Sequence, residues 1–246
     1  MDTAFFNGNH APAVSVEGCC STSDEEVVSW KWDKGNWESI LGFEKTGPAQ
    51  RHGWKLDKPT KPCTHVRLNM YPDGGIARLR VFGRAVPVFD DPDAEVDLAA
   101  AQNGGMAIAC NDQKFGSMHN LILPGRGIDS SDGWETSRSR EEGHTDYAIL
   151  RLGSPGTMVR FMVDTAYFRR NFPESVRILG IEWRGEGEPS EKEEAWTDLI
   201  ERLKCKGHHE HEVDCLLPGR RFTHVKLIMN PDGGVKRLRV FGKVLK

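Results

Sequence analysis

The chain has 246 residues, of which 38% are apolar and 28% are charged, a balance typical of a globular protein of one or two domains. A net charge of −3 and a pI near 6.3 argue against a nucleic-acid-binding surface, and no apolar run approaches the length of a membrane span. The start shows no secretory signal, and the six cysteines show no zinc-like pairing. We therefore expect no nucleic-acid or membrane partner, a cytoplasmic location and reduced thiols.

The first strands are predicted within residues 64–83, THVRLNMYPDGGIARLRVFG. Apolar and polar side chains alternate from Val66 to Met70, which suits a strand with one buried face. Residues 72–75 supply turn chemistry through Pro-Asp-Gly-Gly, and the alternation resumes at Leu79. We interpret this stretch as a structural β-hairpin, and a ligand-binding loop is the alternative.

Residues 90–96 are acidic and contain proline, which indicates a linker. It would separate a first domain, residues 1–89, from a second domain, residues 97–246. The second domain opens with residues 97–109, which could form a short helix followed by a strand, and periodicity does not decide between alternatives there.

Three further strands are predicted at residues 147–152, 158–163 and 176–183, with turns between them. Downstream, Trp196, Leu199, Ile200 and Leu203 follow helical spacing, which predicts one short amphipathic helix.

The densest polar stretch of the chain runs from residue 132 to residue 146. If residues 136–140 are extended, Arg138 and Arg140 project from the same side and form a fork suited to a carboxylate. The alternative is a polar loop held by salt bridges.

The same stretch contains three groups that could transfer protons, Glu135, His144 and Asp146. Trp134 is either part of the binding site or a core residue. No single element here is diagnostic by spacing alone.

Asp164 ends an apolar strand and is the second candidate for catalysis. An acidic residue at that place either takes part in chemistry or caps backbone N–H groups in the next turn, and the sequence leaves both open. A metal site is suggested by His208, His209 and His211. Only His211 has a counterpart in the repeat described next, so we favour a group of loop histidines without a metal.

Residues 64–83 recur as residues 223–242, THVKLIMNPDGGVKRLRVFG, with fifteen of twenty positions identical. The offset of 159 residues is the size of a domain, so we infer a tandem duplication. Asp2-Thr-Ala-Phe-Phe likewise matches Asp164-Thr-Ala-Tyr-Phe. Copy two carries some 65 residues before Asp164, whereas copy one has only Met1 before Asp2, so we expect the first repeat to be incomplete. Its strands would then leave an edge unpaired and an apolar face exposed.

Many short strands with Gly and Pro turns predict an all-β chain of tandem jelly-roll β-sandwich repeats, with one short helix per repeat. At its motifs the sequence resembles the allantoicase (allantoate amidinohydrolase) family. The matching segments are Asn103-Gly-Gly, Asn120-Leu-Ile-Leu-Pro-Gly-Arg, Asp132-Gly-Trp-Glu-Thr-Ser-Arg, Gly143-His-Thr-Asp, Val163-Asp-Thr-Ala-Tyr-Phe, Asn171-Phe-Pro and both copies of the duplicated stretch.

The resemblance implies a galactose-binding-like jelly roll and hydrolysis of allantoate to ureidoglycolate and urea in purine breakdown. It implies no organic cofactor, leaves the use of a metal open and is compatible with a homo-oligomer. We assign acid and base work to Glu135, His144 and Asp164. Substrate binding is assigned to a second set, Arg138, Arg140, Trp134 and Asn171. The enzyme hypothesis predicts that these side chains converge on one pocket, and the competing hypotheses are a non-catalytic binding module and an inactive product.

Overall fold

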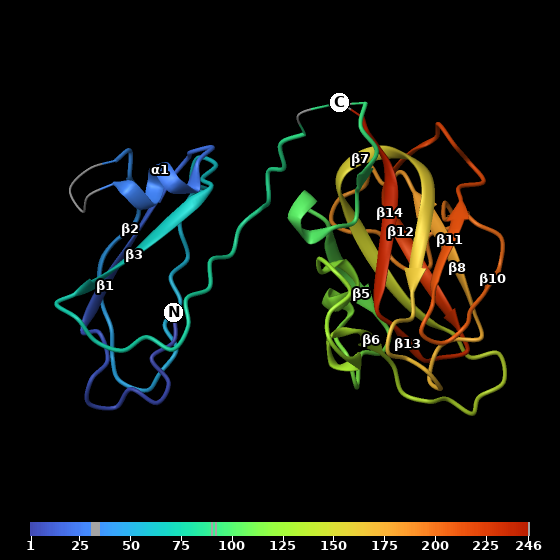
Figure 1. Cartoon of the computed structure of the whole chain (residues 1–246), viewed down its shortest axis with the longest axis horizontal. Coiled ribbons are helices and arrows are strands. Elements are labelled where there is room, and N and C mark those ends of the chain that lie inside the picture. Colours follow the sequence, from blue (N-terminus) through green and yellow to red (C-terminus); the bar gives the residue numbers. More distant parts are fainter. Residues whose placement is uncertain (31–34, 90, 92, 246) are drawn as a thin grey trace. The chain divides into compact units, whose positions relative to one another are not determined.

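The computed structural model describes residues 1–30, 35–89, 91 and 93–245, and the chain divides into two compact units, Met1–Arg84 and Ala85–Lys246. We call them unit 1 and unit 2. Both are built from antiparallel strands (Figure 1). None of the helices in the described residues has the length and apolar character that a membrane crossing requires.

Unit 1 contains a sheet with the strand order β2-β1-β3 and one short helix. Its elements are β1 (Ala13–Cys19), α1 (Asp24–Ser29), β2 (Glu38–Lys45) and β3 (His65–Tyr71). Helix α1 starts where the Ser23 side chain accepts a hydrogen bond from Glu26 N at 3.1 Å, and acidic residues fill its first turn.

Unit 2 contains the remaining elements, in which only 3₁₀ helices (η) accompany the strands among the described residues. They are β4 (Val96–Asp97), η1 (Ala101–Asn103), β5 (Met106–Cys110), η2 (Met118–Ile122), η3 (Ser130–Asp132), β6 (Trp134–Glu135), β7 (Asp146–Asp164), β8 (Ser175–Ile181), β9 (Thr197–Asp198), β10 (Leu203–Lys204), β11 (Glu210–Asp214), β12 (Arg221–Asn230), β13 (Gly234–Val235) and β14 (Arg237–Val244).

Strand β7 organises unit 2 because its two halves belong to two different layers. The first half pairs with β5 on one side and β12 on the other, and β12 pairs in turn with β8. The second half pairs with β11 and β14, and β14 pairs with β4. The buried side chains of both layers face one core that includes Trp134, Leu150, Phe161 and Leu227. This arrangement confirms the predicted all-β sandwich.

The bend in β7 corrects the sequence analysis, which placed a turn between residues 152 and 158. The strand runs without interruption from Asp146 to Asp164, and it arches over the top of the unit in Figure 1. Gly153 lies so close to the backbone of Asn103 that a Cβ atom would stand 1.7 Å from Asn103 O. The glycine permits this close approach within a bent strand, a use that the sequence alone does not separate from a turn.

The predicted hairpins are also wrong. Strands β12 and β14 are not neighbours, because β12 pairs with the first half of β7 and β14 pairs with the second half. The Pro-Asp-Gly-Gly segment between them therefore carries the chain from one layer to the other. In unit 1 the return stretch around Leu79 and Val81 forms no strand. Alternating hydrophobicity identifies a buried face, but it does not identify the neighbouring strand.

The helix expected from Trp196 to Leu203 is not formed either. Thr197 and Asp198 form β9 against β8, and Leu199 N donates to Ile178 O at 2.8 Å. Leu199 and Ile200 are buried, as the helical spacing required, but they reach the core from an extended segment that is hydrogen-bonded to the sheet.

The duplication is visible in the hydrogen bonds of the two units. Thr3 Oγ1 donates to Gly47 O and Gln50 O, at 2.7 and 3.1 Å. Its counterpart Thr165 donates to Lys206 O and His209 O, at 2.6 and 3.1 Å, and these acceptors are 159 residues further along the chain. Residues 2 and 164 therefore lie in equivalent surroundings, which confirms the tandem repeat.

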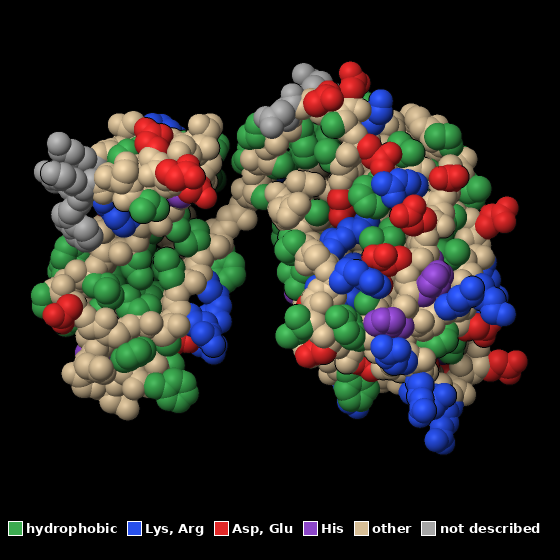
Figure 2. All heavy atoms as spheres, in the orientation of Figure 1, with side chains coloured by type: hydrophobic (Ala, Val, Ile, Leu, Met, Phe, Trp, Pro, Cys, Tyr) green, Lys and Arg blue, Asp and Glu red, His purple; other side chains and the backbone are tan. Residues whose placement is uncertain are grey.

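Strand pairing is conserved between the units as well. In unit 1, β1 pairs with β3 so that Val14 stands opposite Met70, and in unit 2 the corresponding Val176 stands opposite Met229. Burial differs, however, because Met229 is fully buried whereas Met70 is 39% exposed. Within the described residues β3 is an edge strand, and unit 1 has no strand in the place that β7 takes beside β12. Figure 2 shows hydrophobic side chains gathered on the visible face of unit 1.

This contrast predicts different costs for the same substitution in the two copies. Val240→Ala, in the core of unit 2, is expected to reduce the free energy of unfolding by about 2 kcal/mol and the melting temperature by about 4–8 °C. Val81→Ala, at the equivalent position, should change the free energy of unfolding by less than about 0.5 kcal/mol because Val81 is 57% exposed. Scanning calorimetry of both variants checks this, and equal losses would contradict it.

Candidate functional site

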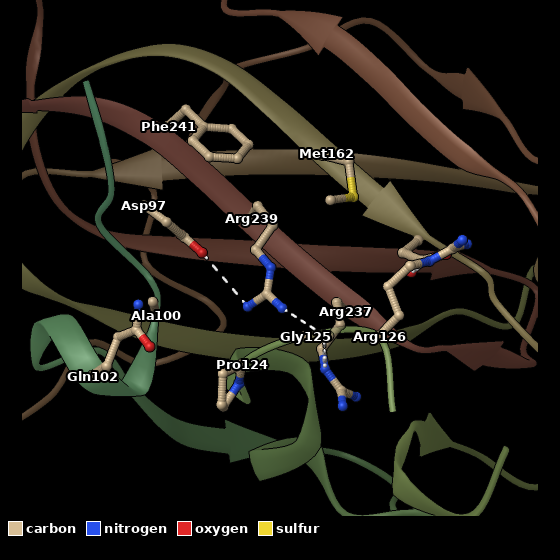
Figure 3. Close-up of a pocket in the computed structure, with 11 residues that line it drawn as sticks. Asp97, Ala100, Gln102, Pro124, Gly125, Arg126, Met162, Arg237, Arg239 and Phe241 are labelled. Atoms are coloured by element: carbon tan, nitrogen blue, oxygen red, sulfur yellow. Dashed lines mark hydrogen bonds and ion pairs between the residues drawn. The ribbon is translucent and has the colours of Figure 1, made fainter. Parts of the chain in front are cut away.

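A pocket of about 320 Å³ lies in unit 2, between β14, the second half of β7 and the loop that precedes η3 (Figure 3). Three arginines and two aspartates line it together with the apolar side chains of Met162 and Phe241. The charged residues are Asp97, Arg126, Asp164, Arg237 and Arg239. We call this cavity the arginine pocket. Its volume is in the range of sites for small molecules, and its arginines outnumber its carboxylates.

Asp164, the last residue of β7, is fully buried at one side of the arginine pocket. Arg126 Nε and Nη2 donate to its two carboxylate oxygens at 2.8 and 2.9 Å, and Ala166 N donates to Oδ1 at 2.8 Å. The two-point hydrogen bond with Asp164 raises the pKa of Arg126. Asp164 therefore caps the turn after β7 and holds Arg126 in place.

Asp97 and Arg239 face each other in the pocket (Figure 3). Asp97 Oδ1 accepts hydrogen bonds from Val240 N at 3.0 Å and Ala99 N at 3.1 Å, whereas Oδ2 lies 3.5 Å from Arg239 Nη1. Burial raises the pKa of Asp97, and the backbone donors and Arg239 only partly offset this effect. A carboxyl group with a raised pKa beside a cavity is suited to proton transfer.

Arg237 belongs to a buried network beneath the pocket. Its guanidinium donates to Gly125 O at 3.0 Å, to Asp132 O at 2.6 Å and to Asp132 Oδ2 at 2.8 Å. Asp132 also contacts Lys236, which is fully buried, and burial together with the charge of Arg237 lowers the pKa of Lys236 to about 8. These contacts fix the loop of residues 125–132 against β14. They engage Nε, Nη1 and Nη2 of Arg237 in hydrogen bonds within the protein.

Further polar contacts lie in the loops next to β6 and the start of β7, and we call their residues together the loop cluster. Asn171 Nδ2 donates to Glu135 Oε1, and Ser139 N donates to Asp232 Oδ2 at 2.8 Å. His144 Nε2 lies 3.0 Å from Asp146 Oδ1. Asp146 is almost fully buried, and among the described residues its Oδ2 has no hydrogen-bond partner.

The residues chosen from the sequence therefore do not all meet in one pocket. Asp164 lines the arginine pocket, whereas Glu135, His144 and Asn171 make their contacts in the loop cluster. Trp134 is fully buried in the core of unit 2, where its Nε1 donates to Asp112 O at 2.9 Å.

Arg138 and Arg140 are exposed on the loop that follows β6. Within the described residues, neither of them forms an ion pair. Their positions are accessible to a ligand, but no contact within the described part of the chain fixes their guanidinium groups.

Sequence reasoning did not select Asp97, Arg126, Arg237 or Arg239 as site residues. Arg237 and Arg239 alternate along β14 together with Phe241, a period of two that marks one face of a strand. That face was interpreted as the polar side of a hairpin. The signal available was two arginines and an aromatic residue on the same face of a strand in a chain of slightly negative net charge.

The described residues hold no group of three or more His, Cys, Asp or Glu side chains placed to bind a metal ion. His211 is buried, and its Nε2 accepts a hydrogen bond from Lys206 N at 2.8 Å while its Nδ1 lies 3.1 Å from Val163 O. Burial lowers the pKa of His211. His208 Nδ1 accepts from Tyr167 N at 2.8 Å, so both histidines support loop backbone.

Comparison with known proteins places these features in one family. A family model described as the allantoicase repeat matches residues 1–86 and 96–245. An allantoicase of Neurospora crassa is 64% identical over 245 residues, which cover 99% of this chain and 69% of the relative. An allantoicase of Saccharomyces cerevisiae is 45% identical over 249 residues, covering 98% of this chain and 71% of the relative.

A solved structure is similar throughout the chain. The crystal structure of allantoicase from Saccharomyces cerevisiae has a TM-score of 0.83 and 44% sequence identity, and the match covers 98% of this chain and 71% of that one.

Proposed function

The chain belongs to the allantoicase family, and from this membership we propose that it hydrolyses allantoate to ureidoglycolate and urea in purine breakdown. The observation that carries the proposal is the 64% identity with the Neurospora crassa allantoicase, which extends over 99% of this chain.

The reaction sets clear requirements for the site. One C–N bond between the central carbon of allantoate and a ureido group breaks, and a C–O bond to water forms. One proton of the water ends on the departing nitrogen of urea, and the other stays on the new hydroxyl group of ureidoglycolate. The site therefore needs a group that exchanges protons and cationic groups that accept the substrate carboxylate.

We place the reaction in the arginine pocket of unit 2. Asp97 supports this placement because burial raises its pKa, which brings its carboxyl group closer to the pH at which it can both give and take a proton. The excess of arginines over carboxylates favours an anionic substrate. Asp164 acts as a positioning residue, since both its oxygens are engaged by Arg126.

The loop cluster is our second proposed location. Glu135 and His144 are its groups for proton transfer, Asn171 orients Glu135, and Arg138 and Arg140 are the accessible cations. The buried Asp146 supports this placement because it orients His144 as an acid–base group.

The test is direct release of urea from allantoate by the purified chain. We expect one urea and one ureidoglycolate for each allantoate consumed, and no urea release from a correctly folded chain would refute the proposed function. Glu135→Gln distinguishes the two locations: in the arginine-pocket placement its kcat stays within about threefold of the parent, whereas a loss of about 100-fold or more moves the chemistry to the loop cluster.

A further inference from the structure

We propose that Arg239 is the residue that selects the substrate by its carboxylate, so that the arginine pocket accepts ureido acids and rejects their uncharged amides. This inference rests on the proposed function and deepens it, because it assigns the specificity of the same pocket to one side chain.

Arg239 occupies a fixed position at the centre of the pocket (Figure 3). It projects from β14, and its Nη2 donates to Leu123 O at 2.7 Å and to Gly125 O at 2.9 Å. Two carbonyl acceptors on the adjacent loop thus hold the guanidinium before any ligand arrives. A preorganised cation loses little conformational freedom on binding, which favours affinity for an anion.

The remaining donors of Arg239 are available on the pocket side. Within the described residues its Nε has no hydrogen bond, and its Nη1 is 3.5 Å from Asp97 Oδ2. That separation is well beyond the 2.7–2.9 Å usual for a charge-assisted hydrogen bond. A carboxylate can therefore approach Arg239 without first breaking a close ion pair.

The other two arginines of the pocket, Arg126 and Arg237, bind acceptors of the protein itself. Arg237 uses its Nε and both terminal nitrogens on the loop of residues 125–132 and on Lys236 O. Arg126 is held by Asp164, and its Nε also lies 3.2 Å from Glu210 Oε1. In Figure 3 its guanidinium points away from Asp97 and Arg239, toward the edge of the pocket.

Apolar walls strengthen the interaction. Phe241 and Met162 line the side of the pocket next to Arg239, which itself is only 11% exposed. A carboxylate bound there would be partly removed from water, where the attraction between opposite charges is stronger. An uncharged amide in the same place would leave the buried guanidinium with only Asp97, at 3.5 Å, as a counter-charge, which is why rejection should be strong.

The binding of the carboxylate by Arg239 also orients the reaction. The central carbon of allantoate is bonded directly to the carboxylate, so anchoring that group beside Asp97 brings the bond to be cleaved close to the proton-transferring carboxyl. Binding and chemistry thus use neighbouring residues of β14 and β4.

Arg239→Gln tests the inference through the split between KM and kcat. We expect KM for allantoate to rise by about 100-fold, with a smaller change in kcat, because an interaction present in both ground state and transition state is lost. Arg184→Gln is the matched control, since it removes the same charge from a side chain that is 81% exposed and lies outside the pocket. Equal KM values for the Arg239 variant, the control and the parent would overturn the assignment.

A second measurement does not depend on the stability of a variant. Glycolate should inhibit the unmodified protein competitively at a concentration at least about tenfold lower than glycolamide, its uncharged counterpart. Arg239→Gln should abolish this preference, and Arg239→Lys should restore part of it. Equal inhibition of the unmodified protein by both compounds would overturn the proposal even if the variants fail to fold.

The two probes also separate this inference from the proposed function. If the unmodified protein releases no urea, titration calorimetry with glycolate and glycolamide still tests whether the pocket selects a carboxylate. Selective binding of glycolate without urea release would retain the inference about Arg239 and refute only the hydrolytic activity.

Discussion

Replacement of Asp97 by asparagine should reduce kcat for urea release from allantoate by about 10²- to 10⁴-fold, the usual contribution of a general acid or base. The reason is the environment of the carboxyl group: burial raises its pKa, its Oδ1 is held by Val240 N and Ala99 N, and its Oδ2 faces the pocket. Asparagine keeps an oxygen for the two backbone donors but cannot exchange the proton. Steady-state urea release by both proteins, at saturating allantoate, measures the effect.

The effect of the same substitution on stability should depend on pH. The folded pKa of Asp97 is raised, so its contribution to stability is fully present below the unfolded pKa and is lost as the pH rises through the folded pKa. Above that range the parent protein holds a buried carboxylate, whereas the variant holds a neutral amide. We therefore expect the melting temperature of Asp97→Asn, relative to that of the parent, to increase as the pH rises.

Together these two results distinguish a catalytic role from a structural one. An active-site carboxyl group is commonly retained at a cost in stability, and its removal then stabilises the protein while it abolishes activity. A structural Asp97 would give the opposite pattern, with unchanged kcat and a lower melting temperature. Unchanged kcat would also direct attention to Glu135 in the loop cluster.

The repeat could be predicted from the sequence because the two copies share the residues that make the same local contacts. Thr3 and Thr165 make the same pair of hydrogen bonds, and the registers around Val14 and Val176 are the same. A motif that returns at a fixed offset specifies the same local contacts twice. Alternation likewise identified Leu227 and Met229 as core residues, and both are fully buried.

The errors concern pairing between distant segments. Nothing local shows that β12 and β14 are separated in space by β7, since both have the alternation of a hairpin and the intervening Pro-Asp-Gly-Gly has turn chemistry. Gly153 and Pro155 look like a turn but lie within a bent strand. Leu199 and Ile200 have helical spacing, but no helix forms there because Leu199 N is hydrogen-bonded to Ile178 O of the sheet.

The arginine pocket was hard to predict for a related reason. Asp97, Arg126 and Arg239 are far apart in the chain, and each is ordinary in its own segment. They meet because β4 pairs with β14 and because the loop of residues 125–132 is tied to Arg237. By contrast, Glu135, Arg138, Arg140 and His144 of the loop cluster were easy to find because they lie within fifteen consecutive positions of the sequence.

Replacement of Asp164 by alanine should reduce the free energy of unfolding of unit 2 by about 3–5 kcal/mol, since it leaves Arg126 without its buried partner and exposes an uncapped N–H at Ala166. Asp2→Ala in unit 1 provides a matched control. Asp2 accepts the equivalent hydrogen bond from Ala4 N at 2.8 Å, but its arginine, Arg51, is 85% exposed at 3.5 Å. That variant should lose only about 1 kcal/mol, the value of a cap.

The double variant Asp164→Ala with Arg126→Met then separates the two contributions. If the ion pair dominates, removal of the arginine restores part of the lost stability, because a cation that has lost its buried partner and retains only Glu210 is gone. Urea-induced unfolding of the single and double variants measures the coupling between the two positions. Equal losses at Asp2 and Asp164, with no restoration in the double variant, would show that the backbone cap alone stabilises this turn and that Arg126 is positioned by other contacts.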